Sequence, residues 1–281
     1  LITFDMYIKK LFMSCSGETQ YNKLGLLQGQ AIDSPLSETG LQQAKAAGHY
    51  LKDVKFSHVF VSDMLRAQET ADTIMKHNSS CLGLQKASDP LLKEKSFGIA
   101  EGKRMLDLKE MAKAAGQSFL NFTPPEGETQ EQVKERVKEF MEKMLQQIGE
   151  EHWDDNGEDE TSRETIPVEG NADDGVRGVL VHALVVTHGA YMVVAVKYFV
   201  EELHCPLPQG LDRARMFSLS PNTGLCRFIL TITKEDGRQA LTGRGPSSPS
   251  TCYCTSGVTN VRPGVQNQPA KGSNPAHGMN L

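Results

Sequence analysis

The pattern of apolar and polar residues in the first half of the chain changes repeatedly between the spacing of a strand and the spacing of a helix. The apolar residues 11–13, followed by a glycine-containing turn at 14–17, predict a strand. Ser37 precedes apolar residues at helical spacing and suits the N-cap of that helix, because its hydroxyl can accept a bond from a free backbone N–H. Residues 58–62 predict the next strand, and residues 65–75 predict the next helix.

The strongest helical pattern begins at Thr129. Thr129 and Gln132 have the spacing of a capping box, in which side chains satisfy the first free N–H groups of a helix. The apolar residues that follow recur on one face of the predicted helix: Val133, Val137, Phe140, Met141, Met144, Leu145 and Ile148. We expect this face to belong to the hydrophobic core.

Residues 150–176 differ in character from the helix before them. They contain eleven Asp or Glu residues and one Arg, with few apolar residues between them. Such a segment cannot bury enough apolar surface to offset the entropy lost on ordering, so it predicts a mobile acidic insertion.

The pattern of a folded domain resumes at residues 179–187, a nearly continuous apolar run that predicts a strand buried on both faces of a parallel sheet. Gly189 is expected to begin a helix that extends to Leu203. Residues 215–220 and 225–232 predict two further strands on either side of a turn at 222–224.

Alternation of strands and helices predicts an α/β domain over residues 1–237, with three layers and a central, mainly parallel sheet flanked by helices. Residues 238–281 are rich in Ser, Pro, Gly and Thr and predict a disordered tail.

The composition excludes several classes of partner. The formal net charge of −5 gives no electrostatic reason to expect nucleic acid. No apolar run reaches the ~20 residues that cross a bilayer, and no signal peptide is evident, so we expect a cytoplasmic protein without a membrane partner. Cys252 and Cys254 form one C-x-C pair, which is half of a zinc site. We therefore expect no metal, no cofactor and separate reduced thiols.

Ligands of open α/β sheets bind at the carboxyl ends of the strands. Polar residues follow three predicted strands, at 15–19, 62–66 and 187–190, and a loop at 92–98 places a glutamate between two lysines. Taken singly, Arg66 is explained as a surface cation, Glu94 as part of a solvated ion pair, and His188 as a hydrogen-bonded core residue. Together they combine two phosphate-binding groups with a proton donor, which is what a phosphoryl-transfer site requires.

Six segments occur in the order typical of the histidine phosphatase (phosphoglycerate mutase-like) superfamily, which this chain resembles from about Ser14 to Thr233. The segments are residues 17–22 (Gly-Glu-Thr-Gln-Tyr-Asn), 35–40 (Pro-Leu-Ser-Glu-Thr-Gly), 62–70 (Ser-Asp-Met-Leu-Arg-Ala-Gln-Glu-Thr), Glu94 with Gly98, 124–129 (Pro-Pro-Glu-Gly-Glu-Thr) and 187–190 (Thr-His-Gly-Ala). Further segments are most similar to the fructose-2,6-bisphosphatase branch of this family, which implies hydrolysis of a sugar bisphosphate such as fructose-2,6-bisphosphate.

The resemblance also implies a mechanism. In the family a histidine at the first strand end attacks phosphorus and forms a phosphohistidine, which water then hydrolyses. By resemblance, Arg66 and His188 would stabilise the transferring phosphoryl group, and Glu94 would be the general acid. Further phosphate or sugar contacts are implied for Asn22, Gln28, Gly29 and Gly189. Lys93 and Lys95 flank Glu94 and are candidates for the second anionic group of the substrate.

The chain departs from the family at the first strand end. The family signature is Arg-His-Gly-Glu-Thr, and this chain has Cys15 at the position of the phosphate-binding arginine and Ser16 at the position of the nucleophilic histidine. A serine hydroxyl without an adjacent base is a weak nucleophile, and a thiol lacks the paired donors of a guanidinium. By the family route, the chain as it reads is therefore expected to be nearly inactive.

Three interpretations are open. The departure is confined to residues 1–16, and everything from Gly17 onward fits the family, so we favour a phosphatase whose residues 1–16 differ from the natural N-terminus. The second interpretation is a catalytically inactive, phosphatase-like binding module, which would hold a phosphorylated ligand or an unidentified protein partner. A phosphoglycerate mutase ranks last.

Overall fold

A computed structural model describes residues 6–117, 122–152, 181–205, 216–235 and 238–240. Within these residues, six strands form one sheet in the order β3-β2-β4-β1-β5-β6. The strands are β1 (Met6–Cys15), β2 (His58–Val61), β3 (Lys86–Ser88), β4 (Val181–Thr187), β5 (Leu225–Glu235) and β6 (Arg238–Ala240). β1 pairs with β4, and β2 with both β4 and β3, in parallel, whereas β5 is antiparallel to β1 and to β6.

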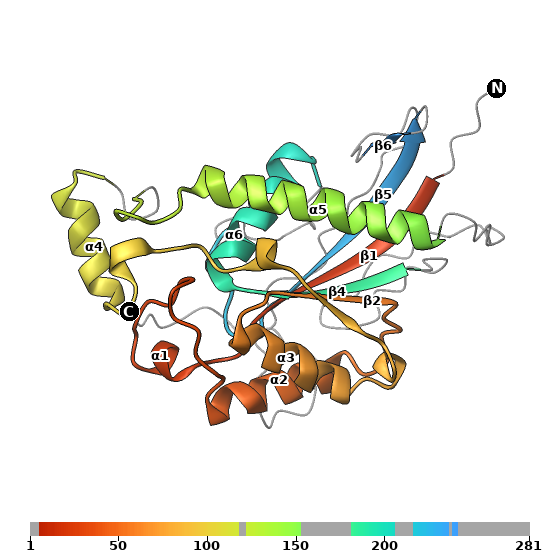
Figure 1. Cartoon of the computed structure of the whole chain (residues 1–281), viewed down its shortest axis with the longest axis horizontal. Coiled ribbons are helices and arrows are strands. Elements are labelled where there is room, and N and C mark those ends of the chain that lie inside the picture. Colours follow the sequence, from red (N-terminus) through yellow and green to blue (C-terminus); the bar gives the residue numbers. More distant parts are fainter. Residues whose placement is uncertain (1–5, 118–121, 153–180, 206–215, 236–237, 241–281) are drawn as a thin grey trace, which may run out of the picture.

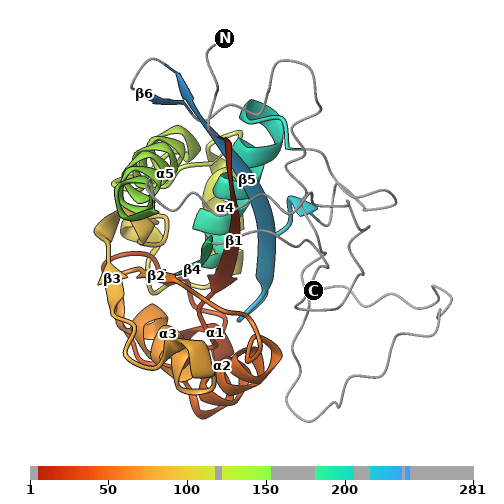
Figure 2. The same cartoon turned by 90° about the vertical axis from the view of Figure 1, so that its right-hand side faces the viewer.

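Helices cover both faces of this sheet, with α5 and α6 on one side and α2 and α3 on the other (Figures 1 and 2). The helices are α1 (Gln20–Lys23), α2 (Glu38–Tyr50), α3 (Leu65–Lys76), α4 (Met105–Ala114), α5 (Gln130–His152) and α6 (Gly189–Lys197). A π-helix, η4 (Tyr198–Glu202), continues α6, and short 3₁₀ helices occur at η1 (Ser79–Cys81), η2 (Pro90–Leu92) and η3 (Gly98–Ala100). The three-layer α/β class with a mainly parallel sheet is therefore confirmed.

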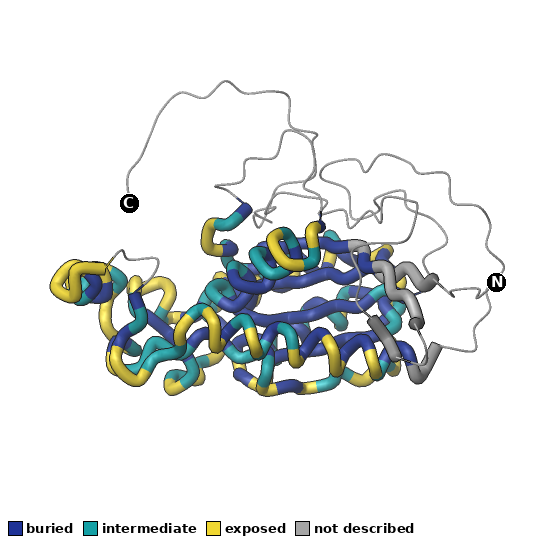
Figure 3. Tube along the Cα trace, turned by 90° about the horizontal axis from the view of Figure 1, so that it is seen from above, coloured by how far each residue is buried: buried dark blue, intermediate teal, exposed yellow. Residues whose placement is uncertain are grey.

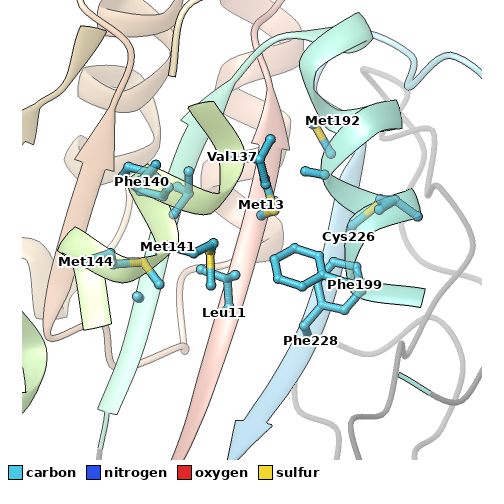
Figure 4. Close-up of a cluster of buried hydrophobic side chains, with 14 of the residues drawn as sticks. Leu11, Met13, Val137, Phe140, Met141, Met144, Met192, Phe199, Cys226 and Phe228 are labelled. Carbon is cyan, nitrogen blue, oxygen red and sulfur yellow. The ribbon is translucent and has the colours of Figure 1, made fainter. Parts of the chain in front are cut away.

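Side chains of β1 alternate between the two faces of the sheet and so contribute to two cores. Leu11 and Met13 pack with α5, α6 and η4, where Phe140 and Phe199 are among the buried residues (Figure 4). Phe12 points the other way and packs with residues of α2 and α3. The central strands are consequently buried on both faces, as the burial colours in Figure 3 show.

Local sequence signals reproduce most of these elements. Ser37 caps α2, with its Oγ atom accepting a bond from the N–H of Gly40 at 3.0 Å. The capping box at α5 forms, because Thr129 and Gln132 exchange bonds of 2.8 and 3.1 Å between side chain and backbone. All seven apolar residues of the predicted face of α5 are buried in the core. Residues 225–232 form most of β5, and the turn at 222–224 is closed by a 2.8 Å bond from the Gly224 N–H to the Pro221 carbonyl.

The predicted strand at 215–220 is wrong for its described residues. Met216 lies in a helical turn, and residues 216–220 pair with no strand of the sheet. The segment is instead used to pack against the start of α6. A Cβ atom on Gly189 would lie 3.1 Å from Leu219 Cδ1 and 3.4 Å from the Ser220 carbonyl oxygen.

Other expectations fall partly or wholly outside the described residues. Of the acidic segment 150–176, residues 150–152 complete α5 and the rest is not described. The predicted tail at 238–281 begins too early, because Arg238–Ala240 pair with β5, and residues 241–281 are not described. Cys15, Cys81 and Cys226 are free thiols, but Cys205 is disulfide-bonded, so the expectation of separate thiols is wrong for Cys205. Among the described helices, none has the length and apolar character needed to span a bilayer.

Candidate active site

The carboxyl ends of β1, β4 and β2 meet at one edge of the sheet because these three strands are adjacent and parallel. Backbone bonds join the residues that follow them. The Ser16 N–H donates to the Thr187 carbonyl at 2.9 Å, and the Ser62 N–H donates to the Val186 carbonyl at 3.0 Å. The first three polar segments singled out in the sequence therefore lie side by side.

His188 follows β4 and is almost completely buried. Its Nε2 atom lies 2.8 Å from the Oγ atom of Ser62. Its buried Nδ1 atom has no hydrogen-bond partner among the described residues. Burial, reinforced by the positive charges of Arg66 and Arg136, holds the pKa of His188 well below its usual value. The imidazole is therefore neutral at neutral pH, and one of its ring nitrogens is left unsatisfied by the part of the chain that the structure describes.

Arg66 lies in the first turn of α3 and is buried rather than exposed on the surface. Its guanidinium donates to the carbonyls of Gly29 and Ile32, each at 3.2 Å. Burial lowers the pKa of Arg66, and the negative charge of Glu94 acts in the opposite direction. Since a free arginine loses its proton only far above neutrality, Arg66 remains a buried cation beside Glu94.

The Glu94 carboxyl lies at the N-terminus of α6. One oxygen accepts bonds from the N–H groups of Lys95 at 2.8 Å and Tyr191 at 2.9 Å, and the other from the Ala190 N–H at 3.1 Å. Burial raises the pKa of Glu94, although these backbone bonds and the charge of Arg66 lower it. The net direction is upward, so Glu94 keeps its proton to a higher pH than an ordinary glutamate, which suits a general acid.

Cys15 and Ser16 occupy the end of β1 next to these groups, and both are buried. Burial and the negative charge of Glu94 raise the pKa of the Cys15 thiol to about 12. At neutral pH Cys15 is therefore a neutral thiol beside Arg66 and Glu94, and it is neither a cation nor a thiolate nucleophile. Ser16 is fixed through its carbonyl, which accepts a 3.1 Å bond from the Thr223 N–H.

The remaining candidate residues lie in α1 and in the loop that follows it. Thr19 is the N-cap of α1, and Asn22 completes its capping box by exchanging bonds with Thr19. Gln28 lies between Thr19 and Ser34, with a 2.6 Å bond to the latter. Gly29 allows this loop to approach its neighbours, because a Cβ atom there would lie 2.1 Å from Glu101 Oε1. The Gly29 carbonyl also accepts the bond from Arg66, so this loop contacts the residue of α3 that the sequence singled out.

Three contacts of this region were not predicted from the sequence. They are the bond between Ser62 and His188, and the bonds that Arg136 and Glu128 make to residues 91–96, the loop that carries Glu94. Ser62 follows a strand in the same way as His188, so its position relative to β2 was a usable signal. Arg136 is on α5, more than forty residues from the loop that it contacts, and no local pattern marked it. The described residues include no cluster of three His, Cys, Asp or Glu side chains that could hold a metal ion.

Comparison with known proteins agrees with this arrangement. Residues 11–153 match the family model of the histidine phosphatase superfamily (branch 1). The chain is 58% identical over 219 residues to a protein of Danio rerio named probable fructose-2,6-bisphosphatase TIGAR A, covering 77% of this chain and 86% of that protein. It is 41% identical over 237 residues to fructose-2,6-bisphosphatase TIGAR of Bos taurus, covering 78% and 86% of the two chains.

Solved structures share the fold. The chain resembles a phosphoglycerate mutase of Bacillus anthracis with a TM-score of 0.56 and 25% identity, over 84% of this chain and 92% of that one. A mycobacterial glucosyl-3-phosphoglycerate phosphatase has the same fold, with a TM-score of 0.58 and 21% identity over 79% and 91% of the chains. From its fold, the order of its motifs and these relatives, the chain belongs to the histidine phosphatase superfamily.

Proposed function

We propose that the protein is a phosphatase of the fructose-2,6-bisphosphatase type, and that Cys15 and Ser16 limit its turnover by the phosphohistidine route. The observation that carries this proposal is the convergence of Arg66, His188 and Glu94 at the shared edge of β1, β2 and β4. The relatives named fructose-2,6-bisphosphatases support the choice of a sugar bisphosphate as substrate.

The groups have complementary tasks in such a reaction. The Arg66 guanidinium and the ring of His188 would donate to the phosphoryl oxygens, on which charge develops in the transition state. With a histidine at position 16, a P–N bond would form as the bond to the leaving oxygen breaks. Glu94 would give its proton to the leaving alkoxide and take one from the attacking water in the second step. Water would then release phosphate and restore the histidine.

The second phosphate of the substrate needs a separate anion-binding group. Lys95 is 8% exposed and follows Glu94 directly. Burial lowers the pKa of its ammonium group, and the charges of Glu128 and Glu94 act in the opposite direction. We propose that Lys95 contacts this second phosphate, together with Lys93, whose ammonium lies 3.3 Å from Asp63 Oδ2 at the surface.

A second candidate function is a binding module without turnover. Cys15 and Ser16 favour it, because neither supplies the nucleophile or the guanidinium of the family signature. A phosphoglycerate mutase is the least favoured alternative, and product analysis separates it, since a mutase returns an isomerised phosphoester and little free phosphate. The cytoplasmic location stays a prediction that cell fractionation can test.

The decisive experiment compares phosphate release from fructose-2,6-bisphosphate by the chain as it reads and by the double variant Cys15→Arg, Ser16→His. We expect turnover only in the double variant. Titration calorimetry with the same ligand on the unmodified chain tests the binding module. Equal rates in both proteins would contradict the assigned roles, and a folded double variant without phosphatase activity would eliminate the leading proposal.

A further inference from the structure

Arg136 of α5 divides its guanidinium donors between the segment that carries Glu94 and the carboxylate of Glu128. Its Nη1 atom donates to the carbonyls of Leu91 at 2.7 Å and Lys93 at 3.0 Å, and its Nη2 atom donates to the Glu94 carbonyl at 3.4 Å. The other two N–H groups bind Glu128. Five contacts match the five donors of an arginine, and three of them go to backbone oxygens of residues 91–94.

Glu128 fixes the guanidinium and extends its hold on the loop. The two carboxylate oxygens accept from Arg136 Nε at 2.9 Å and from Nη2 at 2.8 Å, which is a bidentate pair. One of these oxygens also accepts from the Ser96 N–H at 2.8 Å and from the Gln30 side chain at 2.9 Å. Gln30 in turn donates to the Glu94 carbonyl at 2.8 Å. The loop is therefore held on both sides of Glu94.

Arg136 also contacts the other side of the Glu94 site. Its guanidinium lies over the ring of Tyr191, 5.5 Å from the ring centre, and the Tyr191 N–H is one of the three donors to the Glu94 carboxyl. The same side chain thus touches the loop that bears Glu94 and the helix end that receives it. The side chains of Arg136 and Glu128 are only 17% and 21% exposed, so water weakens this pair less than a surface pair.

We propose that Arg136, locked by Glu128, is a positioning residue that seats the Glu94 carboxyl on the N-terminus of α6. The proposal deepens the proposed function, because it rests on Glu94 acting as the general acid there. Because all five donors of Arg136 are used on protein groups, we assign it no direct contact with the substrate. It acts through the backbone of residues 91–94, which needs both its charge and the paired donors of its planar guanidinium.

The first test needs no activity. Hydrogen exchange of the full chain is measured at the backbone N–H groups of Lys95, Ala190 and Tyr191, which donate to Glu94. We expect Arg136→Met to raise exchange at least ten-fold at these sites. Arg136→Lys should do nearly the same, since a lysine keeps the charge and loses the fork. Lys138→Met is the matched control: it lies on the same helix and removes an ion pair with Glu202. Unchanged exchange in Arg136→Lys, or an equal rise in the control, would overturn the proposal.

The second test uses the Cys15→Arg, Ser16→His background and two leaving groups. Dinitrophenol leaves without a proton, whereas the sugar alkoxide needs one, so misplacement of the acid slows formation of the phosphohistidine only from the sugar substrate. This step is compared through kcat/KM, because hydrolysis of the phosphohistidine also uses Glu94 and is common to both substrates. We expect Arg136→Met to lower kcat/KM for fructose-2,6-bisphosphate by about 100-fold, within the range for loss of general acid catalysis, and to change kcat/KM for dinitrophenyl phosphate by less than about three-fold. Equal losses on both substrates would mean a general structural role. If the background has no activity, the proposed function fails, and the exchange result still decides the positioning role.

Discussion

The Nε2 atom of His188 lies 2.8 Å from the Oγ atom of Ser62, although the two residues are 126 positions apart. The same Oγ atom accepts a 3.3 Å bond from the Met64 N–H. A hydroxyl has one donor and two acceptor positions, so Ser62 can hold Nε2 in either tautomer of the ring. The other ring nitrogen, Nδ1, has no hydrogen-bond partner among the described residues. In the proposed function Nδ1 donates to a phosphoryl oxygen, which requires the Ser62 hydroxyl to donate to Nε2.

Replacing Ser62 by alanine tests this pair. Ser62→Ala leaves a second ring nitrogen of a buried imidazole unsatisfied, which is expected to lower the free energy of unfolding by about 1–3 kcal/mol. Urea denaturation measures it. Ser79→Ala, at an exposed serine in η1, should change the stability by less than about 0.5 kcal/mol. Equal effects of the two variants would mean that the His188 bond does not stabilise the fold.

Arg66→Met is expected to weaken binding of inorganic phosphate by roughly 10- to 100-fold, or about 1.4–2.8 kcal/mol, because it removes a buried cation with paired donors. Titration calorimetry provides the dissociation constants. Arg104→Met is the control, since Arg104 is exposed and pairs with Asp107 on α4. A phosphate affinity that survives in Arg66→Met contradicts the phosphate-clamp assignment.

Glu94 is expected to make stability depend on pH. Because its pKa is raised in the folded protein, its contribution to stability is fully present below the ordinary glutamate pKa and is lost as the pH rises through the raised value. Glu94→Gln removes this titration, so the variant should gain stability relative to the parent as the pH rises above the ordinary glutamate pKa of 4.5. Denaturation at several pH values tests this, with exposed Glu110→Gln as control. If the free energy of unfolding changed with pH in the same way for the parent and for Glu94→Gln, the raised pKa of Glu94 would be refuted.

Gly17 is expected to tolerate no side chain. A Cβ atom there would lie 2.7 Å from the backbone oxygen of Gly40, in the first turn of α2. Backbone cannot yield as a side chain can, so Gly17→Ala should cost about 1–3 kcal/mol. Gly83→Ala is the comparison: its new methyl group meets no atom, but its φ of +80° is strained for alanine, so about 1 kcal/mol is expected. Thermal denaturation ranks the two variants, and a milder effect at Gly17 would contradict the close approach.

Cys15 is expected to resist alkylation in the folded protein. With a pKa of about 12, only about one thiol in 10,000 is ionised at pH 8, and the side chain is buried. Peptide mapping after treatment with iodoacetamide should show Cys15 labelled only when the chain is unfolded in guanidinium. Rapid labelling under native conditions would instead identify Cys15 as an accessible nucleophile and reopen its assignment.

Most of the helices and strands, and the polar groups at the strand ends, could be predicted from the amino-acid sequence. Apolar periodicity and caps are local signals, so the strand at 11–13, the cap at Ser37 and the buried face of α5 all followed from neighbouring residues. The parallel sheet then brought Ser16 and His188 to one edge by geometry alone. Arg66 and Glu94 were found by motif, since their residue types alone matched surface cations and solvated ion pairs equally well.

The protonation of these groups and the contacts that hold them depend on the folded structure. The neutral ring of His188 and the raised pKa of Glu94 come from burial, which depends on everything packed around them. Residues 216–220 do not form the predicted strand, and Leu219 and Ser220 of this segment instead pack against Gly189 at the start of α6. Arg136 acts on a loop that precedes it by more than forty residues. Such contacts depend on which surfaces meet after the chain folds, and a local pattern carries no information about that.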